Sequence, residues 1–559
     1  MIAKRMRTSA YSPTRKSVII VIPARGGSKG IPRKNLRSLN GVPLIAYSIR
    51  TAIASMHKPL VVVSTDDQEI AVIAEKEGAN VHVRDPELAA DATTLDPVIH
   101  DAVTSMEVRF STRFDLVVTQ QPTSPLLSTR SLDTAISNIL ADPTLHTIIS
   151  ATTDTHLSWR REGGRFIPNY AKRLNRQYLP ATYRETGGFL ICRRDVITED
   201  SRIGRNVALH ELEMPESIDI DNHADWGILT HYLRRRKFLF VVTGHRTVGM
   251  GHVYNSLLIA NDLANHEVEF LVDSRSQLAY DAIAQRNYQV HMQSSANLAD
   301  DVNSLAPDIV VNDRLDTSLE YMQAITEAGR KIINIEDLGD GARAAHVVIN
   351  ALYSDAELGH ATRVYSGPVV AMLRDEFMLT TPSQFRSAAR RVLITFGGTD
   401  PGDYTGTVLE AIQPWCRAHG VAIDIVAGIG YDGLANLHLE TGTTVHQDVR
   451  AISVLMSDAD IAFTSAGRTL FELASVGTPA IVLAQNEREL THTFASAENG
   501  FVHLGLGKNV GREQLLEAFV DLATDVDLRR RLRDRMLSVD LRQGRRNVAR
   551  IVEEIATQS

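Results

Sequence analysis

Three glycines and four cations crowd into one short stretch of the chain, which suits it to hold a polyphosphate. The stretch begins after Pro23, which ends the apolar run Val18 to Ile22. Glycines let a backbone approach a ligand closely and turn its N–H groups toward it. Arg and Lys add charge-assisted hydrogen bonds to phosphate oxygens. The glycines are Gly26, Gly27 and Gly30, and the cations are Arg25, Lys29, Arg33 and Lys34.

The spacing matches neither of two common phosphate-binding glycine motifs. The Gly-Lys-Ser/Thr ending of a Walker A loop is missing, and so is the Gly-x-Gly-x-x-Gly spacing of a dinucleotide site. On composition alone, a solvated basic turn after a strand explains the stretch equally well.

Two carboxylates alternate with two isoleucines in the segment Glu216-Ser-Ile-Asp-Ile-Asp221. In a strand, Asp219 and Asp221 would share one face about 6–7 Å apart, and the isoleucines would face the core. Such a pair can converge on Mg²⁺, with Mn²⁺ as the alternative, and the metal would neutralise charge on a leaving pyrophosphate. An exposed strand face or a helix N-cap is the plainer alternative.

A second glycine loop, in the other half of the chain, carries a histidine. Phe238 to Val242 has the pattern of a strand, Thr247-Val-Gly-Met-Gly-His252 follows it, and Val253 to Leu263 has helical spacing. A strand, a glycine loop and a helix open many nucleotide-binding α/β units. A lone histidine after two glycines is also often only a packing or capping residue.

The elements that must position these residues alternate between strand and helix. Such alternation predicts a mostly parallel sheet covered on both faces, with ligands beyond the carboxyl ends of its strands. The loops 23–35, 65–67, 84–96 and 120–130 should therefore carry the chemistry. The predicted strands are 18–22, 60–64, 80–84, 115–119 and 147–151, and the predicted helices are 43–55, 67–77, 94–106, 131–140 and 222–233.

The second half predicts two further α/β units in tandem, which form the two lobes of a glycosyltransferase-B-like fold with the ligand in the cleft. The second of these units starts at Arg391-Val-Leu-Ile-Thr-Phe-Gly-Gly-Thr-Asp400. The predicted strands after 238–242 lie near 268–272, 308–312, 331–335 and 346–350, and then near 391–395, 422–427, 459–464 and 479–483.

Bulk properties exclude several classes of protein. The 559 residues are too many for one core, and the net charge of −8 gives no basic footprint for nucleic acid. The two cysteines, Cys192 and Cys416, make neither a disulfide framework nor a zinc spacing. No apolar run is long enough to span a bilayer, and residues 1–16 lack the apolar region of a signal peptide. We expect a cytoplasmic protein with a disordered tail at 1–16 and no nucleic-acid or membrane partner.

The loop at 23–35 resembles the signature loop of the CMP-sialic acid synthetases, the cytidylyltransferases that activate nonulosonic acids. Further matches are Arg84-Asp-Pro-Glu-Leu-Ala-Ala-Asp91, Gln121-Pro-Thr-Ser-Pro125 and the Ile-Asp-x-Asp pattern ending at Asp221. The resemblance implies that Arg25, Lys34 and Asp221 act in catalysis, and that Asp219 and Asp221 hold the metal. The implied nucleotide contacts are Ala24, Arg25, Gly26, Ser28, Lys29, Lys34, Arg84 and Asp91, and the implied sugar contacts are Gln121, Arg176 and Arg184.

From 152 to 186 the alternation of strand and helix fails, and the segment is polar and aromatic. A stretch this irregular inside a domain is usually functional or disordered. In the synthetases this region is an insertion that supports a homodimer and places arginines beside the acidic sugar. Bidentate Arg suits a carboxylate, which favours Arg176 and Arg184. Thr186 stands where better-studied relatives have Asn, so the acyl-amide contacts, and with them the sugar, stay open.

The loop Gly249-Met-Gly-His252 resembles that of the UDP-sugar hydrolase that releases 2,4-diacetamido-2,4,6-trideoxy-L-altrose on the route to pseudaminic acid. Supporting matches are Leu373-Arg-Asp-Glu-Phe377, Gly397-Gly-Thr-Asp400 and Ser465-Ala-Gly-Arg-Thr469. The resemblance implies that His252 orients or deprotonates water. The implied nucleotide contacts are Gly251, Ser465, Ala466, Gly467, Thr469, Glu472 and Asn486.

Three departures from the hydrolase pattern keep alternatives open. Asn255 stands where the hydrolases have Arg, Glu487 stands where they have Gln, and Asp403-Tyr404 lies near a usual Asn. Loss of the Arg removes a cation from the sugar–phosphate side. The second half is therefore predicted to be a UDP-sugar hydrolase, a glycosyltransferase or a non-catalytic nucleotide-sugar-binding module.

Together these patterns predict an α/β bifunctional enzyme. Residues 17–235 would form a Rossmann-like cytidylyltransferase domain, with 152–186 as its dimerisation and substrate insertion. Residues 236–559 would form the hydrolase-like domain, with lobes at about 237–388 and 389–559. The substrates would be CTP, an acidic nine-carbon sugar and a UDP-sugar. Homodimerisation is expected through the first domain.

Overall fold

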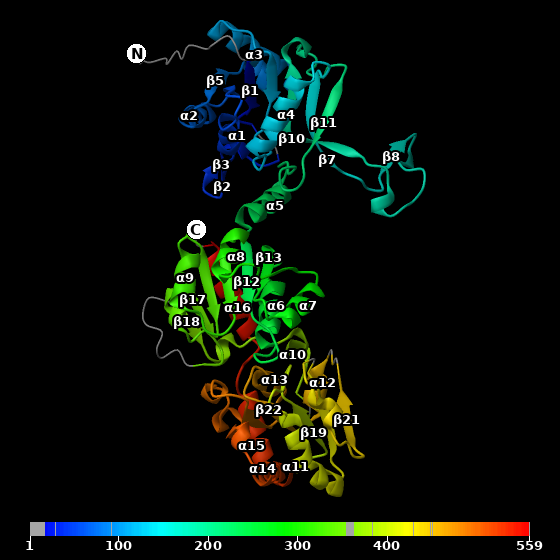
Figure 1. Cartoon of the computed structure of the whole chain (residues 1–559). Helices are drawn as coiled ribbons and strands as arrows, with labels where there is room; N and C mark the ends of the chain where they lie inside the picture. Colours follow the sequence, from blue (N-terminus) through cyan, green and yellow to red (C-terminus); the bar gives the residue numbers. More distant parts are fainter. Residues whose placement is uncertain are drawn as a thin grey trace. The chain divides into compact units, whose positions relative to one another are not determined.

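The computed structural model describes residues 17–27, 30–90, 92–353, 363–382, 384–428, 430–447, 449 and 451–557. The predicted tail at 1–16 and the predicted contacts Ser28, Lys29 and Asp91 lie outside the described residues. The chain forms two compact units, Met1–Leu233 and Arg234–Ser559 (Figure 1). Every helix in the described part of the chain is too short or too polar to cross a membrane.

The first unit is built on a seven-stranded mixed sheet with the order β11-β7-β10-β6-β1-β4-β5. Strand β10 runs antiparallel to both β6 and β7, and the other neighbours are parallel. A small hairpin, β2 and β3, follows the loop after β1. The bounds are β1 Val18–Pro23, β2 Ser38–Leu39, β3 Val42–Pro43, β4 Leu60–Thr65, β5 Asn80–Val83, β6 Leu116–Thr119, β7 Thr147–Thr153, β10 Tyr183–Arg193 and β11 Val207–Glu211.

Helices cover both faces of this sheet, which explains why β1 is apolar at successive positions. Ile20 and Ile22 pack in a core with residues of α1, α2 and α4, whereas Ile19 and Val21 pack on the other face with residues of α3. The helices are α1 Leu44–Ile53, α2 Gln68–Lys76, α3 Leu95–Phe110, α4 Thr129–Ala141 and α5 His223–Arg234.

The sequence prediction missed β10 and β11 of the first unit, and two further segments differ from it. Asp219 and Asp221 lie in a loop rather than in a strand. Even so, Ile218 and Ile220, which alternate with the aspartates, are buried, because they pack with Ile31 and Leu229 beneath the loop. The region 152–186 contains a hairpin, β8 Trp159–Glu162 and β9 Arg165–Pro168, which projects from the sheet (Figure 1).

The second unit contains two all-parallel sheets. The first lobe has the order β14-β13-β12-β15-β16-β17-β18, and the second lobe has the order β21-β20-β19-β22-β23-β24. In each lobe the order reverses beside the first strand, which is where α/β sheets bind ligands. The bounds are β12 Lys237–Val242, β13 Glu267–Val272, β14 Gln289–Met292, β15 Ile309–Asp313, β16 Lys331–Ile335, β17 Val347–Asn350, β18 Arg363–Ser366, β19 Arg391–Thr395, β20 Ala422–Val426, β21 Thr443–His446, β22 Ile461–Ser465, β23 Ala480–Ala484 and β24 Phe501–Leu506.

Helices connect these strands, and the last helix returns to the first lobe. Arg545 of α16 donates to Asp262 at the end of α6, with Nε 2.8 Å from Oδ2. Asn547 of α16 donates to the carbonyl of Val369. The helices are α6 Gly251–Asp262, α7 Gln277–Ala284, α8 Leu298–Leu305, α9 Leu319–Thr326, α10 Asp375–Leu379, α11 Tyr404–His419, α12 Ile452–Asp458, α13 Thr469–Val476, α14 Arg512–Thr524, α15 Val526–Leu537 and α16 Gly544–Thr557.

The predicted fold class is confirmed. The first unit is a Rossmann-like α/β sheet with helices on both faces, and the second unit is a two-lobed, glycosyltransferase-B-like α/β structure. The sequence prediction missed four strands in the second unit, namely β14, β18, β21 and β24.

Candidate functional site

The loop after β1 is held in place by the end of the neighbouring strand β4. Gly26 donates its N–H to Asp66 Oδ1 at 3.0 Å, and the N–H of Ala24 donates to the Ser64 carbonyl. Within the loop, Asn35 Nδ2 donates to the Arg25 carbonyl at 3.1 Å. The backbone of the predicted polyphosphate loop is therefore held by the protein at Ala24, Arg25 and Gly26.

The same loop lies directly against the segment that carries the two aspartates. A Cβ added at Gly30 would lie 2.2 Å from the Asp221 carbonyl oxygen, so this approach requires glycine. Lys34 Nζ donates to the Ile220 carbonyl at 2.5 Å. Burial lowers the pKa of Lys34, and the neighbouring carboxylates, Asp221 foremost, oppose that shift. Loop, lysine and carboxylates therefore form one cluster.

Asp219 is the more enclosed of the two carboxylates. Burial raises its pKa, and a hydrogen bond from Thr123 and then the charge of Lys34 oppose that shift. Asp221 is exposed beside it. Together they present one buried and one open carboxylate at the edge of the sheet.

Three buried oxygens lie close together at Asp219. They are Asp219 Oδ1, Thr123 Oγ1 and Ser124 Oγ, and the Thr123 hydroxyl is near enough to Asp219 to oppose the raised pKa of its carboxyl. A Cβ added at Gly187 would lie 2.8, 2.9 and 3.0 Å from these three atoms. The oxygens therefore surround one small space.

Of the other predicted residues of the first unit, Arg84 and Gln121 lie beside the loop and the oxygen cluster, whereas the arginines of the 152–186 region are exposed. Arg84 is buried under the glycine loop, where Nη2 donates to the Ser64 carbonyl at 2.9 Å and burial lowers its pKa. Gln121 borders the oxygen cluster, since its N–H donates to the Gly187 carbonyl. Arg184 is exposed, and its charge opposes the raised pKa of Asp219. Arg176 is exposed after the projecting hairpin, and no hydrogen bond or ion pair of the described residues joins it to the cluster.

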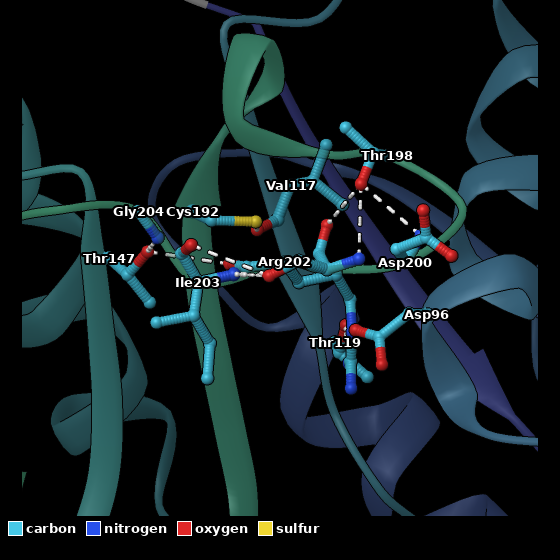
Figure 2. Close-up of polar contacts among 11 residues, drawn as sticks. Asp96, Val117, Thr119, Thr147, Cys192, Thr198, Asp200, Arg202, Ile203 and Gly204 are labelled. Atoms are coloured by element: carbon cyan, nitrogen blue, oxygen red, sulfur yellow. Dashed lines mark hydrogen bonds and ion pairs between the residues drawn. The ribbon is translucent and has the colours of Figure 1, made fainter.

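An arginine that the sequence prediction missed anchors the same edge of the sheet. Arg202 Nε lies 2.8 Å from Asp96 Oδ1 at the start of α3, and Nη1 donates to Thr119 Oγ1 at the end of β6 at 2.9 Å. Figure 2 shows Arg202 reaching both groups. Its own loop is held by Thr147, which accepts from the Gly204 N–H. This arginine lies in a polar loop and belongs to no periodic or motif pattern, so the sequence offered no signal that singled it out.

The second unit contains a cavity of about 380 Å³ between its two lobes. Residues from both lobes line it, and they include every residue predicted for nucleotide binding or catalysis in this unit. These residues are Gly251, His252, Ser465, Ala466, Gly467, Thr469, Glu472 and Asn486.

His252 is paired with a buried aspartate that the sequence prediction missed. His252 Nδ1 lies 2.6 Å from Asp313 Oδ1, and Asp313, the last residue of β15, is fully buried. Asn255 Nδ2 and Ser256 Oγ both donate to the other oxygen of Asp313, at 2.8 and 3.1 Å. An aspartate at the end of a strand, 61 residues further along the chain, gave no local pattern that joined it to the histidine.

Two of the predicted nucleotide contacts are already used by the protein. The N–H of Ala466 donates to Glu489 Oε2 at 3.2 Å, so this amide does not point freely into the cavity. Glu472 accepts from Arg374 Nε at 2.6 Å. Burial raises the pKa of Glu489, which also accepts from the N–H of Gln485.

Two arginines of the second lobe reach groups of the first lobe. Arg468 Nη1 donates to Asn255 Oδ1 at 2.7 Å, and Arg468 also lies 3.4 Å from Glu336. Arg488 lies 2.7 Å from Asp316 and stacks over Tyr353. The lobes are therefore linked at the base of the cavity by charged groups that sequence spacing did not reveal.

The three departures from the hydrolase pattern occupy different surroundings. Asn255 is buried in the network around Asp313. Tyr404 packs in the core of the second lobe, and Glu487 is exposed with its side chain 4.0 Å from Lys508.

Comparison with known proteins connects the first unit to named relatives. Residues 19–194 match the cytidylyltransferase family. One relative is the post-translational flagellin modification protein B of Campylobacter coli. It is 30% identical over 225 residues, which are 39% of this chain and 96% of the relative. The CMP-N,N'-diacetyllegionaminic acid synthase of Campylobacter jejuni is 32% identical over 218 residues, which are 38% of this chain and 93% of that enzyme.

Other similarities cover less of each partner or show only weak superposition. The uncharacterized protein MJ1062 of Methanocaldococcus jannaschii is 28% identical over 314 residues, which are 49% of this chain and 64% of MJ1062, so the chain spans less than two thirds of it. A solved CMP:2-keto-3-deoxy-manno-octonic acid synthetase in complex with CTP gives a TM-score of 0.30 at 17% identity, over 39% of this chain and 98% of the synthetase. The calicheamicin glycosyltransferase CalG4 gives 0.39 at 16% identity, over 58% of this chain and 99% of CalG4.

The glycine loop, the half-buried Lys34 and the two aspartates lie together in the first unit, whose sequence aligns with almost the whole length of two of these relatives. The chain therefore belongs, through its first unit, to the cytidylyltransferase family.

Proposed function

We propose that the first unit transfers CMP from CTP to the anomeric hydroxyl of a nonulosonic acid and releases pyrophosphate. The observation that carries this proposal is the contact between the glycine loop and the aspartate segment. Gly30 packs on the Asp221 carbonyl, and Lys34 donates to Ile220 between the two aspartates. A triphosphate on the loop would then have cations on one side and carboxylates on the other.

In this proposal the protein acts mainly by positioning and by electrostatics. Arg25 and Lys34 bind phosphate oxygens, and the fixed backbone around Gly26 cradles the chain of phosphates. Gln121 and Arg184 orient the acidic sugar so that its anomeric hydroxyl faces the α-phosphorus in line with the departing pyrophosphate. No covalent intermediate with the protein is required.

The two aspartates fit a divalent cation. Asp219 Oδ1 is buried beside the hydroxyls of Thr123 and Ser124, and Asp221 is open beside it. The described residues contain no group of three or more metal-binding side chains. One or two carboxylates plus substrate phosphates is the usual environment of Mg²⁺. Mg²⁺, or Mn²⁺, would neutralise charge on the triphosphate when held by Asp219 and Asp221.

The sugar is proposed only as a class. Pseudaminic, legionaminic and neuraminic acids share the carboxylate that an arginine can bind. Thr186, which donates to Ser150 Oγ at 2.8 Å, faces the protein interior. Exposed aromatic residues on the hairpin, such as Trp159 and Phe166, support the proposal that 152–186 mediates a homodimer.

The test is pyrophosphate release from CTP and Mg²⁺ with a panel of these three acids. We expect release with at least one acid, and loss of release in Asp221→Ala and on chelation of the metal. Asp225→Asn is not a suitable control, because Asp225 caps the same segment. Asp200→Asn, on an exposed loop, is the matched control. Failure of every acid to release pyrophosphate would refute the proposal.

For the second unit we propose hydrolysis of a UDP-linked diacetamido-trideoxy sugar to UDP and free sugar. The observation that favours it is the pair His252 and Asp313 at the wall of the cavity, because a histidine held by a carboxylate is suited to accept a proton from water. UDP released without an acceptor would support hydrolysis. Turnover only after an acceptor glycan is added would support a glycosyltransferase, and binding without turnover would support a non-catalytic module.

A further inference from the structure

We propose that Asp313 is the positioning residue that makes His252 a general base, and that Asn255 and Arg468 hold this pair in place across the two lobes. This inference rests on the proposed hydrolysis by the second unit. It concerns the residues that prepare that reaction rather than the reaction itself.

The position of the pair follows from the order of the strands. Strand β15 lies beside β12, and α6 begins after the loop that follows β12. The end of β15 and the first turn of α6 therefore meet where the strand order reverses. This places Asp313 under His252 at the cavity wall.

The hydrogen bonds around Asp313 determine which nitrogen of His252 can carry a proton. One carboxylate oxygen of Asp313 accepts hydrogen bonds from Asn255 Nδ2 and Ser256 Oγ. The other oxygen is hydrogen-bonded to His252 Nδ1. An ionised carboxylate only accepts hydrogen bonds, so Nδ1 must be the protonated nitrogen of a neutral His252. The lone pair is then on Nε2, as in other histidines oriented by a carboxylate.

Nε2 is then the atom that can take a proton from water in the cavity. One O–H bond of water breaks and its proton moves to Nε2, while the water oxygen forms a bond to the anomeric carbon. The bond between that carbon and the phosphate oxygen breaks, and UDP leaves with the electron pair. The proton on Nε2 is later released to solvent, so the products are the free sugar, UDP and a proton.

Asn255 is suited to connect the pair to the other lobe. Its Nδ2 donates to Asp313, and its Oδ1 accepts from Arg468 Nη1 at 2.7 Å. Only a side chain with a donor at one position and an acceptor at the other can make both contacts, and an arginine has no acceptor. Arg468 belongs to the loop before α13 of the second lobe. The base is therefore complete when both lobes contribute.

The experiment measures UDP release from UDP-linked 2,4-diacetamido-2,4,6-trideoxy-L-altrose by the full chain. We expect Asp313→Ala to lower kcat about 100-fold or more with KM changed less than about threefold, and formate to restore part of kcat. The fold-changes follow from the usual size of general-base catalysis. Asp301→Ala is the matched control, because Asp301 is a buried carboxylate of the same lobe that accepts from Ser294 and Ser295, away from the cavity. That control should keep its kcat and show no effect of formate.

A second readout does not depend on turnover. Histidine labelled with ¹⁵N in the full chain reports which ring nitrogen is protonated, and His252→Gln identifies the resonance. We expect protonation at Nδ1 in the wild type and a mixture with Nε2 protonation in Asp313→Ala. UDP binding by calorimetry, unchanged in Asp313→Ala, shows that the cavity remains folded.

The outcomes separate this inference from the proposed function. If the wild type releases no UDP, the hydrolase proposal fails, and the nitrogen resonances alone decide the role of Asp313. Protonation at Nε2 in the wild type would overturn the inference, with or without turnover. An active Asp313→Ala variant, or a loss of kcat with an unchanged histidine resonance, would overturn it as well.

Discussion

Gly30 sets how closely the glycine loop can approach the aspartate segment. We predict that Gly30→Ala forces the loop and Asp221 apart, because the new Cβ would meet the Asp221 carbonyl oxygen at 2.2 Å. The expected destabilisation is about 1–3 kcal/mol, as for overpacked sites. A displacement of about 1 Å in a catalytic site can lower the rate about 100-fold. Thermal unfolding and pyrophosphate release measure the two effects.

Gly27→Ala is the matched control for this prediction. No atom lies within 4 Å of a Cβ added at Gly27. Its unfolding temperature should equal that of the wild type. If Gly30→Ala unfolds at the same temperature as Gly27→Ala, then Gly30 is not confined as the structure indicates.

The ionised side chain of Asp219 should lower the free energy of unfolding of the metal-free protein at neutral pH. Burial raises its pKa, so folding favours the protonated form. Stability from this group is therefore fully present at low pH and is lost as pH rises from the ordinary value of an aspartate, about 3.9, through the raised value in the folded state. We predict that Asp219→Asn unfolds at a higher temperature than the wild type at pH 7 without metal, although it loses pyrophosphate release.

The pH dependence of the difference in unfolding temperature between Asp219→Asn and the wild type tests whether ionisation of Asp219 is the cause. The difference in unfolding temperature should shrink as the pH falls toward and below about 3.9, because the wild-type carboxyl then becomes protonated in both the folded and the unfolded state. A difference that stays constant from pH 4 to pH 8 would contradict a cost of ionisation. Adding Mg²⁺ should also narrow the difference, because only the wild type would gain from binding the cation.

At the scale of residues, the sequence predicted which side chains are buried better than it predicted which side chains contact each other. The alternation around Asp219 and Asp221 correctly placed the isoleucines inside, because burial follows from the apolar side chains alone. It did not reveal that the segment is a loop, since ladder hydrogen bonds depend on which strand lies beside it. Asp313 was missed for the same reason, because its partner His252 is distant in the chain.

At the scale of elements, Arg202 fastens the start of α3 to the end of β6. We predict that Arg202→Met destabilises the first unit by about 3 kcal/mol, because it leaves Asp96 with an unpaired, largely buried charge. The KM for CTP should rise as well, since the loop 84–96 ends at α3. Denaturant unfolding and initial rates at varied CTP measure these effects.

Arg50→Met is the matched control for this ion pair. Arg50 pairs with Glu77 through two hydrogen bonds of 2.8 Å, but its side chain is 54% exposed. Exposed pairs usually contribute about 1 kcal/mol or less. In the double variant Arg202→Met with Asp96→Asn the loss should be smaller than in Arg202→Met alone. Equal losses in the single and double variants would show that the charge of Asp96 is not the cause.

Most elements that the sequence did not predict lie at the margin of a sheet or outside it, but the unpredicted β10 lies inside the first sheet, between β7 and β6. Strand β14, Gln289–Met292, alternates polar and apolar residues over only four positions, and β18 is equally short. Such segments become strands because the neighbouring strand, β13 or β17, offers them hydrogen bonds. The long apolar strands β1 and β12 were predicted closely, because they are buried on both faces and their composition is sufficient.

At the scale of the whole molecule, each unit has its own cores. The apolar clusters around β1 contain only residues of the first unit, and those around β12 and β19 contain only residues of the second. The return of α16 to the first lobe could not be inferred from its amphipathic pattern, which shows that the helix is packed on one side but not against what. The packing of α16 in the second unit thus depends on contacts between residues that are far apart in sequence.

Separate cores lead us to predict that the two proposed activities can be lost one at a time in the full chain. Asp221→Asn should abolish pyrophosphate release and leave UDP release within about twofold of the wild type. His252→Gln should do the reverse, because neither side chain contributes to the packing of the other unit. Both products are measured in the same samples, so that protein concentration cancels. If either single substitution lowers both activities by similar factors, the sites are energetically coupled, and the view of two independently folded catalytic units would have to be abandoned.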